Sequence, residues 1–177
     1  MLRNIYIFAV SLLIACLMPM TALAQFAASS GQDIELYADD IVSVNGVTTL
    51  TGQADIRQGD VRLLADVVRI YSSGANGAAV AANASDISRV EADGNFYYLT
   101  QDQEVRGSKG VYDAATDEFT VTGDVTLLQN GSVVTGTKLV YAVGQQKARV
   151  SSDCRGRKCG LNRRVSVLIK NNGNQAR

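Results

Sequence analysis

Residues 50–70, LTGQADIRQGDVRLLADVVRI, decide the fold of this chain. Apolar and polar residues alternate as far as a turn at Gln58-Gly59-Asp60, and they alternate again up to Ile70. Alternation with a period of two, interrupted by a Gly-Asp pair, is typical of two antiparallel strands with one buried face. We therefore predict a β-hairpin in this stretch.

The layout of this hairpin returns twice along the chain. Counted from Gly52, Gly94 and Gly123, the thirteenth residue on is small, the eighteenth is large and apolar or aromatic, and a glutamine stands near each turn. These positions hold Ala65, Gly107 and Gly136, then Ile70, Tyr112 and Tyr141, and finally Gln58, Gln101 and Gln129. One hairpin cannot bury its apolar face alone, so the repetition predicts an all-β fold of stacked antiparallel hairpins.

Glycine-containing pairs mark the expected turns between strands. Asn45-Gly46 and Asn130-Gly131 are strong hairpin signals because both residues tolerate a positive φ. Asp93-Gly94 is predicted to be a turn as well, and each repeat glycine is expected to precede a strand. The alanine- and glycine-rich stretch 72–85 is interpreted as an inserted surface loop, which makes the first repeat longer than the second.

The first 24 residues have the pattern of an export signal. Arg3 precedes an apolar stretch over residues 5–17, Pro19 ends it, and Ala22-Leu23-Ala24 provides a small-x-small cleavage site. We therefore expect a signal peptide over residues 1–24, removed near Ala24.

Cleavage at that site leaves one domain over residues 25–170 and a polar tail over 171–177, which we expect to be disordered. Two alternatives stay open. Leu13-Ile14-Ala15-Cys16 resembles a lipobox, which would make Cys16 a lipidated N-terminus, and the apolar stretch could also remain as an anchor. The apolar residues after Cys16, together with Pro19, favour cleavage.

Charge is distributed unevenly along the chain. Residues 25–146 contain 16 acidic and 7 basic side chains, whereas residues 147–177 contain 9 basic side chains and one acidic one. A basic end on an acidic body is typical of a protein that binds an anionic ligand or an acidic partner at that end. A solvated tail explains the charge equally well.

Two cysteines, Cys154 and Cys159, remain after the signal peptide is removed. In an oxidising compartment an even pair this close together predicts a local disulfide. We expect it to stabilise a hairpin between strands at residues 147–151 and 164–170.

The chain contains no histidine, which excludes Ser-His and Cys-His catalytic pairs and histidine metal sites. Two cysteines without further ligands do not predict a metal site either. The aspartates at expected turns and polar faces are explained by capping and solubility; they are Asp39, Asp40, Asp66, Asp113 and Asp117. We therefore expect no catalytic residues, no metal and no cofactor.

Two stretches carry a resemblance to a known family. They are Thr51-Gly52…Gln58-Gly59…Ala65-Asp66-Val67-Val68 and Phe119-Thr-Val-Thr-Gly123-Asp-Val…Gly136-Thr-Lys-Leu-Val-Tyr141. With the exported N-terminus, they resemble the OstA-like domain family of lipopolysaccharide-transport proteins, the family of LptA, over residues 34–170. The resemblance implies a β-jellyroll, a twisted stack of antiparallel strands that is open at both ends and has an apolar lumen. The 72–85 stretch and the cysteine pair depart from the family pattern.

The resemblance also implies function and partners. It predicts a non-enzymatic periplasmic bridge that binds lipopolysaccharide through its lipid A moiety and carries it from the inner to the outer membrane. The implied partners are an LptC-type inner-membrane protein at the N-terminal edge, an LptD-type outer-membrane protein at the C-terminal edge, and further copies of the chain, head to tail. No nucleic acid is expected. The acidic start of the first strand and the basic last strand, residues 163–170, independently favour head-to-tail pairing.

Large apolar residues at the repeat positions are the candidates to line the lumen. Each is equally suited to an ordinary β core. They are Ile34, Leu36, Ile56, Leu63, Ile70, Phe96, Tyr98, Tyr112, Phe119, Val121, Leu127, Leu139 and Tyr141.

Three other functions stay open at this point. One is an inner-membrane anchored LptC-type subunit of the same pathway, which an N-terminus beginning at Gln25 would exclude. Another is a β scaffold that polymerises through its edge strands without binding lipid, which lipid bound to the purified protein would exclude. The third is a carbohydrate-active β-solenoid enzyme, and the spacing of the carboxylates gives it no support.

Overall fold

The computed structural model describes residues 32–73, 84–143, 145, 147–154, 156–160 and 163–170. The predicted signal peptide, its alternatives at Cys16, most of the 72–85 loop and the C-terminal tail lie outside these residues. No helix in the described part of the chain is long and apolar enough to cross a membrane.

The described residues form one antiparallel sheet of ten strands. Its strands are β1 (Ile34–Tyr37), β2 (Asp40–Val44), β3 (Val47–Gln58), β4 (Val61–Ser72), β5 (Ile87–Leu99), β6 (Gln103–Asp113), β7 (Glu118–Gln129), β8 (Ser132–Ala142), β9 (Lys147–Ser151) and β10 (Ser166–Leu168). Two short 3-10 turns, η1 (Ala84–Asp86) and η2 (Arg157–Cys159), complete the elements. The predicted all-β fold of stacked antiparallel hairpins is confirmed.

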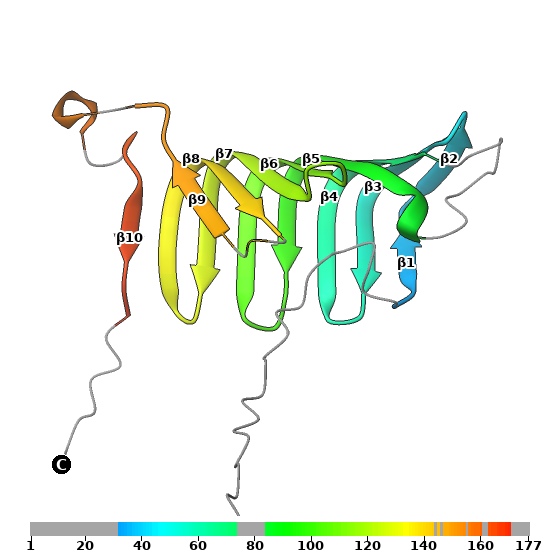
Figure 1. The fold of residues 1–177 in the computed structure, drawn as a ribbon, viewed down its shortest axis with the longest axis horizontal. Coiled ribbons are helices and arrows are strands. Elements are labelled where there is room, and N and C mark those ends of the chain that lie inside the picture. Colours follow the sequence, from blue (N-terminus) through cyan, green and yellow to red (C-terminus); the bar gives the residue numbers. More distant parts are fainter. Residues whose placement is uncertain are drawn as a thin grey trace, which may run out of the picture.

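The long strands β3 to β8 pair in chain order, and the edge strands stand at opposite ends of the row (Figure 1). At one end β1 and β2 pair with successive halves of β3, and at the other β9 and β10 pair with successive halves of β8. The sheet path ends at these strands, so the sheet is not closed.

Tight turns join neighbouring strands as the sequence predicts. The loops Asn45-Gly46 and Asn130-Gly131 adopt positive φ at both residues, which matches the right-handed twist of the flanking strands. The Gly59-Asp60 loop connects β3 to β4.

The repeat glycines lie in the middle of strands, so the prediction that they precede strands, with a turn at Asp93-Gly94, is wrong. Pairing shifts at Gly52-Gln53 in β3, Gly94-Asn95 in β5 and Gly123-Asp124 in β7, where both residues of each pair have positive φ. These are bulges that bend each strand without ending it. A glycine with a positive φ serves a bulge as well as a turn, so the residue type alone did not distinguish the two.

The prediction that residues 147–151 and 164–170 form a hairpin is also wrong. Strand β9 pairs with Lys138–Ala142 of β8, and the shorter β10 pairs with Val133–Thr135 of the same strand. The two therefore lie end to end in one layer, and residues 152–165 connect them at the bend.

Candidate functional site

The thirteen predicted lumen residues all belong to one apolar cluster inside the bent sheet. Five are half-buried and pack against the cluster, namely Ile34, Leu36, Tyr98, Phe119 and Tyr141. The other eight are at most 9 % exposed. The ring of Phe119 packs at a tilt against two others, with centroid distances of 5.6 Å to Phe96 and 5.3 Å to Tyr98. The structure therefore brings all the candidates together.

Small residues at the bends let the two halves of each strand face one another. A Cβ atom at Gly110 would lie 2.4 Å from the ring of Phe96, although Phe96 pairs with Gly107 on the other side of the bend. Likewise, a Cβ atom at Gly107 would lie 2.5 Å from Val121. The side chains thus cross the bend to pack against the opposite half, which explains why the thirteenth repeat position is small.

Several interior residues are absent from the predicted set, and most of them are alanines or valines. They are Leu50, Ala54, Ala65, Val68, Ile87, Val90, Ala92, Val105, Val125 and Val143. In β4 the buried positions are Val61, Leu63 and Ala65 before the bend, and Val68 and Ile70 after it. At Asp66, which lies opposite the bulges of β3 and β5, the alternation shifts by one residue, so a strict period of two assigns the wrong face beyond it.

The apolar interior extends to both ends of the sheet. Ile34 and Leu36 on β1 reach it at one end, and Val134 on β8 and Val150 on β9 reach it at the other. All four are only half-buried. The apolar interior therefore reaches both edge layers, where its side chains are only partly covered.

A buried tyrosine supplies one of the polar atoms beside this interior. The Tyr112 hydroxyl donates a hydrogen bond to Asp117 Oδ1 at 3.3 Å. Burial, followed by the charge of Asp117, raises the pKa of Tyr112, so it stays an uncharged phenol at neutral pH. Tyr112 therefore adds a neutral polar tip to an otherwise apolar surface.

Charged side chains cover the outer face in cross-strand networks. Arg69 on β4 pairs with Asp93 on β5 at 3.0 Å, and Lys109 on β6 pairs with the same carboxylate at 3.0 Å. Arg89 contacts Glu91 at 2.7 Å and Asp113 at 3.1 Å. The body thus has an apolar inside and an ion-paired outside.

The five aspartates expected at turns and polar faces are dispersed over this surface. Asp39 and Asp66 lie beside the bulge glycines Gly52 and Gly94, and Asp113 and Asp117 have the partners described above. Asp40 is exposed at the start of β2. Within the described ranges, no group of three or more Cys, Asp or Glu is placed to hold a metal ion.

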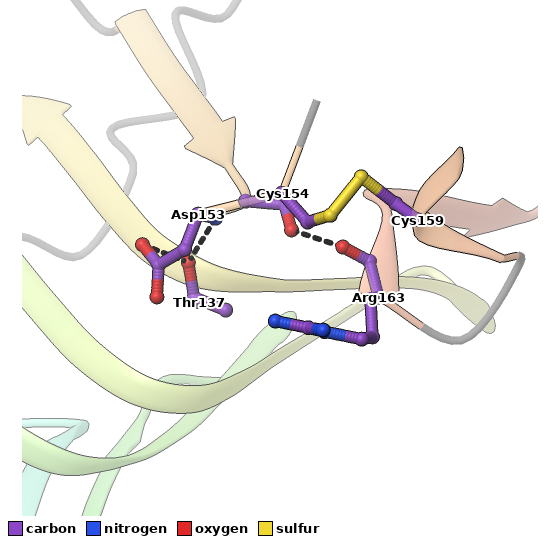
Figure 2. The surroundings of a disulfide bond; sticks show 6 residues. Thr137, Asp153, Cys154, Cys159 and Arg163 are labelled. Carbon is purple, nitrogen blue, oxygen red and sulfur yellow. Dashed lines mark hydrogen bonds between the residues drawn. A yellow bond between two sulfur atoms is a disulfide. The ribbon is translucent and has the colours of Figure 1, made fainter. Parts of the chain in front are cut away.

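Figure 2 shows the predicted disulfide between Cys154 and Cys159, whose Cα atoms lie 5.7 Å apart. Thr137 Oγ1 donates to Asp153 Oδ1 and accepts from the Asp153 backbone N–H, both at 3.0 Å. Ser152 Oγ donates to the carbonyl oxygen of Arg163, and this bond closes the base of the loop. The described residues between β9 and β10, which are 152–154, 156–160 and 163–165, therefore form a braced loop, which we call the disulfide loop.

A protein-family model matches residues 35–147; it is described as the LptA/(LptD N-terminal domain) LPS transport protein family. The chain belongs to this family. The matched residues run from β1 to the start of β9, so they include every long strand and stop before the disulfide loop. The resemblance seen in the sequence is thereby confirmed, and the family is one of lipopolysaccharide transport.

Among solved structures, the chain is similar to LptH from Pseudomonas aeruginosa, described as the LptA homologous periplasmic component of the conserved lipopolysaccharide transport device. The two share 21% sequence identity with a TM-score of 0.59, over 79% of this chain and 96% of LptH. This likeness confirms the jellyroll fold. A search of curated protein sequences found no match.

Proposed function

We propose that this member of the LPS-transport family is a periplasmic bridge protein that carries lipopolysaccharide from the inner to the outer membrane. The lipid A chains lie in the apolar interior and the sugars remain outside. The observation that carries the proposal is the single apolar cluster that runs between two unclosed ends of the sheet. Burial of an acyl chain contributes about 0.8 kcal/mol per methylene, so binding needs no catalytic group.

The chains enter by separating the two halves of the bent sheet. Phe96 is fully buried in the interior, whereas Tyr98 and Phe119, which lie beside it, are only half-buried. Side chains cross the bend at Gly107 and Gly110, where the ring of Phe96 and a methyl group of Val121 make van der Waals contacts. An acyl chain can replace such packing with packing of its own, which keeps the free-energy cost of opening small.

The edge layers support the proposed partners. At the N-terminal edge, Tyr37, Ile41, Val42 and Val44 are exposed, and at the C-terminal edge, Val165, Val167, Leu168 and Ile169 are exposed. Exposed edge strands with large apolar residues are templates for strand addition. We assign the first edge to an LptC-type inner-membrane protein, the second to an LptD-type outer-membrane protein, and both to head-to-tail pairing of copies of this chain.

The amount of lipopolysaccharide that the purified protein retains tests the proposal. Two neighbouring leucines provide a matched pair of variants, one inside the sheet and one on its outer face. Leu127 is 9 % exposed inside the sheet, whereas Leu128 is 38 % exposed on its outer face. We expect mass spectrometry to find lipopolysaccharide on wild-type protein and on Leu128→Asp, and to find little on Leu127→Asp, because a carboxylate in an apolar space is strongly unfavourable. Wild-type protein without lipid, or equal retention by both variants, would contradict the proposal, and the first result would favour a polymerising scaffold.

A further inference from the structure

Basic side chains of the body and of the C-terminal end differ in their partners. Six cations on β3 to β6 each pair with a carboxylate; they are Arg57, Arg62, Arg69, Arg89, Arg106 and Lys109. Among the described residues from β8 onward, the cations make no ion pair; they are Lys138, Lys147, Arg149, Arg157, Lys158, Arg163, Arg164 and Lys170. The C-terminal end therefore presents uncompensated positive charge.

Four of these cations lie on the disulfide loop: Arg157, Lys158, Arg163 and Arg164. On β8, Lys138 pairs with Ser151 at the end of β9, and Thr135 pairs with Ser166 at the start of β10. The disulfide loop therefore lies opposite Thr137 on one side of β8, as the two-residue bulge of β7 does on the other side. The disulfide and the bonds to Thr137 and Arg163 fix its base (Figure 2). The loop is thus a charged, braced structure at the bend of the last layer.

The strands of the sheet alternate between two kinds at this bend. One kind has a single polar residue there, as Asp39 between β1 and β2, Asp66 in β4 and Ser108 in β6, each placed against the bulge glycine of the next strand. The other kind is the bulged strand itself. The β9–β10 layer stands where the alternation requires a bulged strand. A strand that continues the sheet beyond it is therefore of the kind with a single polar residue at the bend. In this chain that strand is the β1–β2 layer.

The same alternation fixes how a second copy would dock. Within the chain, β2 pairs with the part of β3 before the bulge and β1 with the part after it. On the last layer, the corresponding parts are β9 and β10. The β2 strand of a second copy would therefore lie along β9, its β1 strand along β10, and its Asp39-Asp40 bend beside the disulfide loop.

We propose that the disulfide loop binds the Asp39-Asp40 bend of the copy that docks on the last layer. Both aspartates are exposed and make no ion pair with described residues of their own chain. The loop cations Arg157 and Lys158 supply the complementary charge, and the apolar residues of β1, β2 and β10 supply the adjoining contact. The inference rests on the head-to-tail pairing in the proposed function and assigns its electrostatic contact.

Charge reversal measured by sedimentation equilibrium tests this contact. We expect Arg157→Glu/Lys158→Glu and Asp39→Lys/Asp40→Lys each to weaken self-association by about tenfold or more, because like charges then face each other. The variant that combines all four changes should recover to within about threefold of wild type, since opposite charges face each other again. Asp102→Lys/Glu118→Lys changes exposed acids of the body by the same charge as the bend variant and should have little effect.

The possible results separate the inference from the proposal beneath it. Wild-type protein that stays monomeric at high concentration and low salt would contradict head-to-tail pairing and the inference with it. Wild-type association that none of the reversals changes beyond the Asp102/Glu118 control would overturn the inference alone. Loss of bound lipopolysaccharide from the Arg157/Lys158 variant, with association intact, would also overturn it, because the loop would then bind lipid phosphate.

Discussion

At the scale of single residues, Asp55 shows how the outer surface is stabilised. Its carboxylate accepts hydrogen bonds from Arg62 Nη2 at 2.7 Å, from Arg62 Nε at 2.8 Å and from Arg57 Nη2 at 2.8 Å. Its side chain is only 12% exposed. Hydrogen bonds from Arg62, the largest effect, and from Arg57 outweigh burial and lower the pKa of Asp55 from 3.8 to about 2. The folded state therefore favours the ionised carboxylate.

Replacing Asp55 with asparagine should reduce stability in a pH-dependent way. The folded pKa is depressed, so the stabilisation is present above the unfolded pKa of 3.8 and is lost as the pH falls toward about 2. We expect Asp55→Asn to lower the free energy of unfolding by roughly 1–2 kcal/mol at pH 7. Urea unfolding at several pH values measures the difference from wild type. A difference that stays constant from pH 7 to pH 2 would show that the carboxylate charge is not responsible.

At the scale of elements, the bend in each strand organises the molecule. The bulge at Gly94-Asn95 keeps both halves of β5 in one strand, and the Asn95 amide donates to Asp66 Oδ2 of the neighbouring strand at 3.0 Å. The single polar residue at the bend of β4, Asp66, thus stabilises the bulge of the neighbouring strand β5. Asp39 and Ser108 lie in the same way against the bulge glycines Gly52 and Gly123, so the bends align and the apolar faces of successive layers join into one interior.

Hairpins and their burial were predictable from local sequence, but the bends were not. Alternation around Ile56 and Leu63 and the turn at Asn130-Gly131 directly indicate strands with one buried face. Whether Gly94 ends a strand or bends it depends on pairing with Asp66 and β6, which lie elsewhere in the sequence. The same limit applies to β9 and β10: strand propensity identifies them, whereas their common partner β8 is set by the stack.

Removal of the disulfide should weaken one loop and leave the body folded. The cysteines are separated by 5 residues, and so short a loop gains only about 2 kcal/mol from the restricted unfolded chain. We expect Cys154→Ser/Cys159→Ser to lower the melting temperature by roughly 4–8 °C. Thiol titration of periplasmic wild-type protein should find no free thiol at these two positions. Failure of the double variant to fold would show that the loop stabilises far more than its own residues.

At the scale of the whole molecule, the arrangement separates three surfaces. The interior is apolar and reaches both edge layers, and the outer face of the body is covered by ion pairs. The two ends carry charges of opposite sign that make no ion pair with described residues, beside exposed apolar strands. A bridge that holds acyl chains and joins to neighbours needs all three surfaces. Family membership identifies the pathway, and these surfaces account for how the fold can serve it.

The central claim is that lipopolysaccharide is carried in the apolar interior. Photo-crosslinking from one interior and one exterior position of β7 tests it most directly. A photoreactive phenylalanine analogue replaces Phe119, which faces the interior, or Leu128, which is exposed on the outer face, in bacteria that synthesise lipopolysaccharide. Aromatic replacement keeps the size and apolar character of the Phe119 ring, so its packing against Phe96 and Tyr98 should persist. We expect lipopolysaccharide adducts at Phe119 and few or none at Leu128. Adducts at Leu128 that equal or exceed those at Phe119 would contradict lipid transport through the interior.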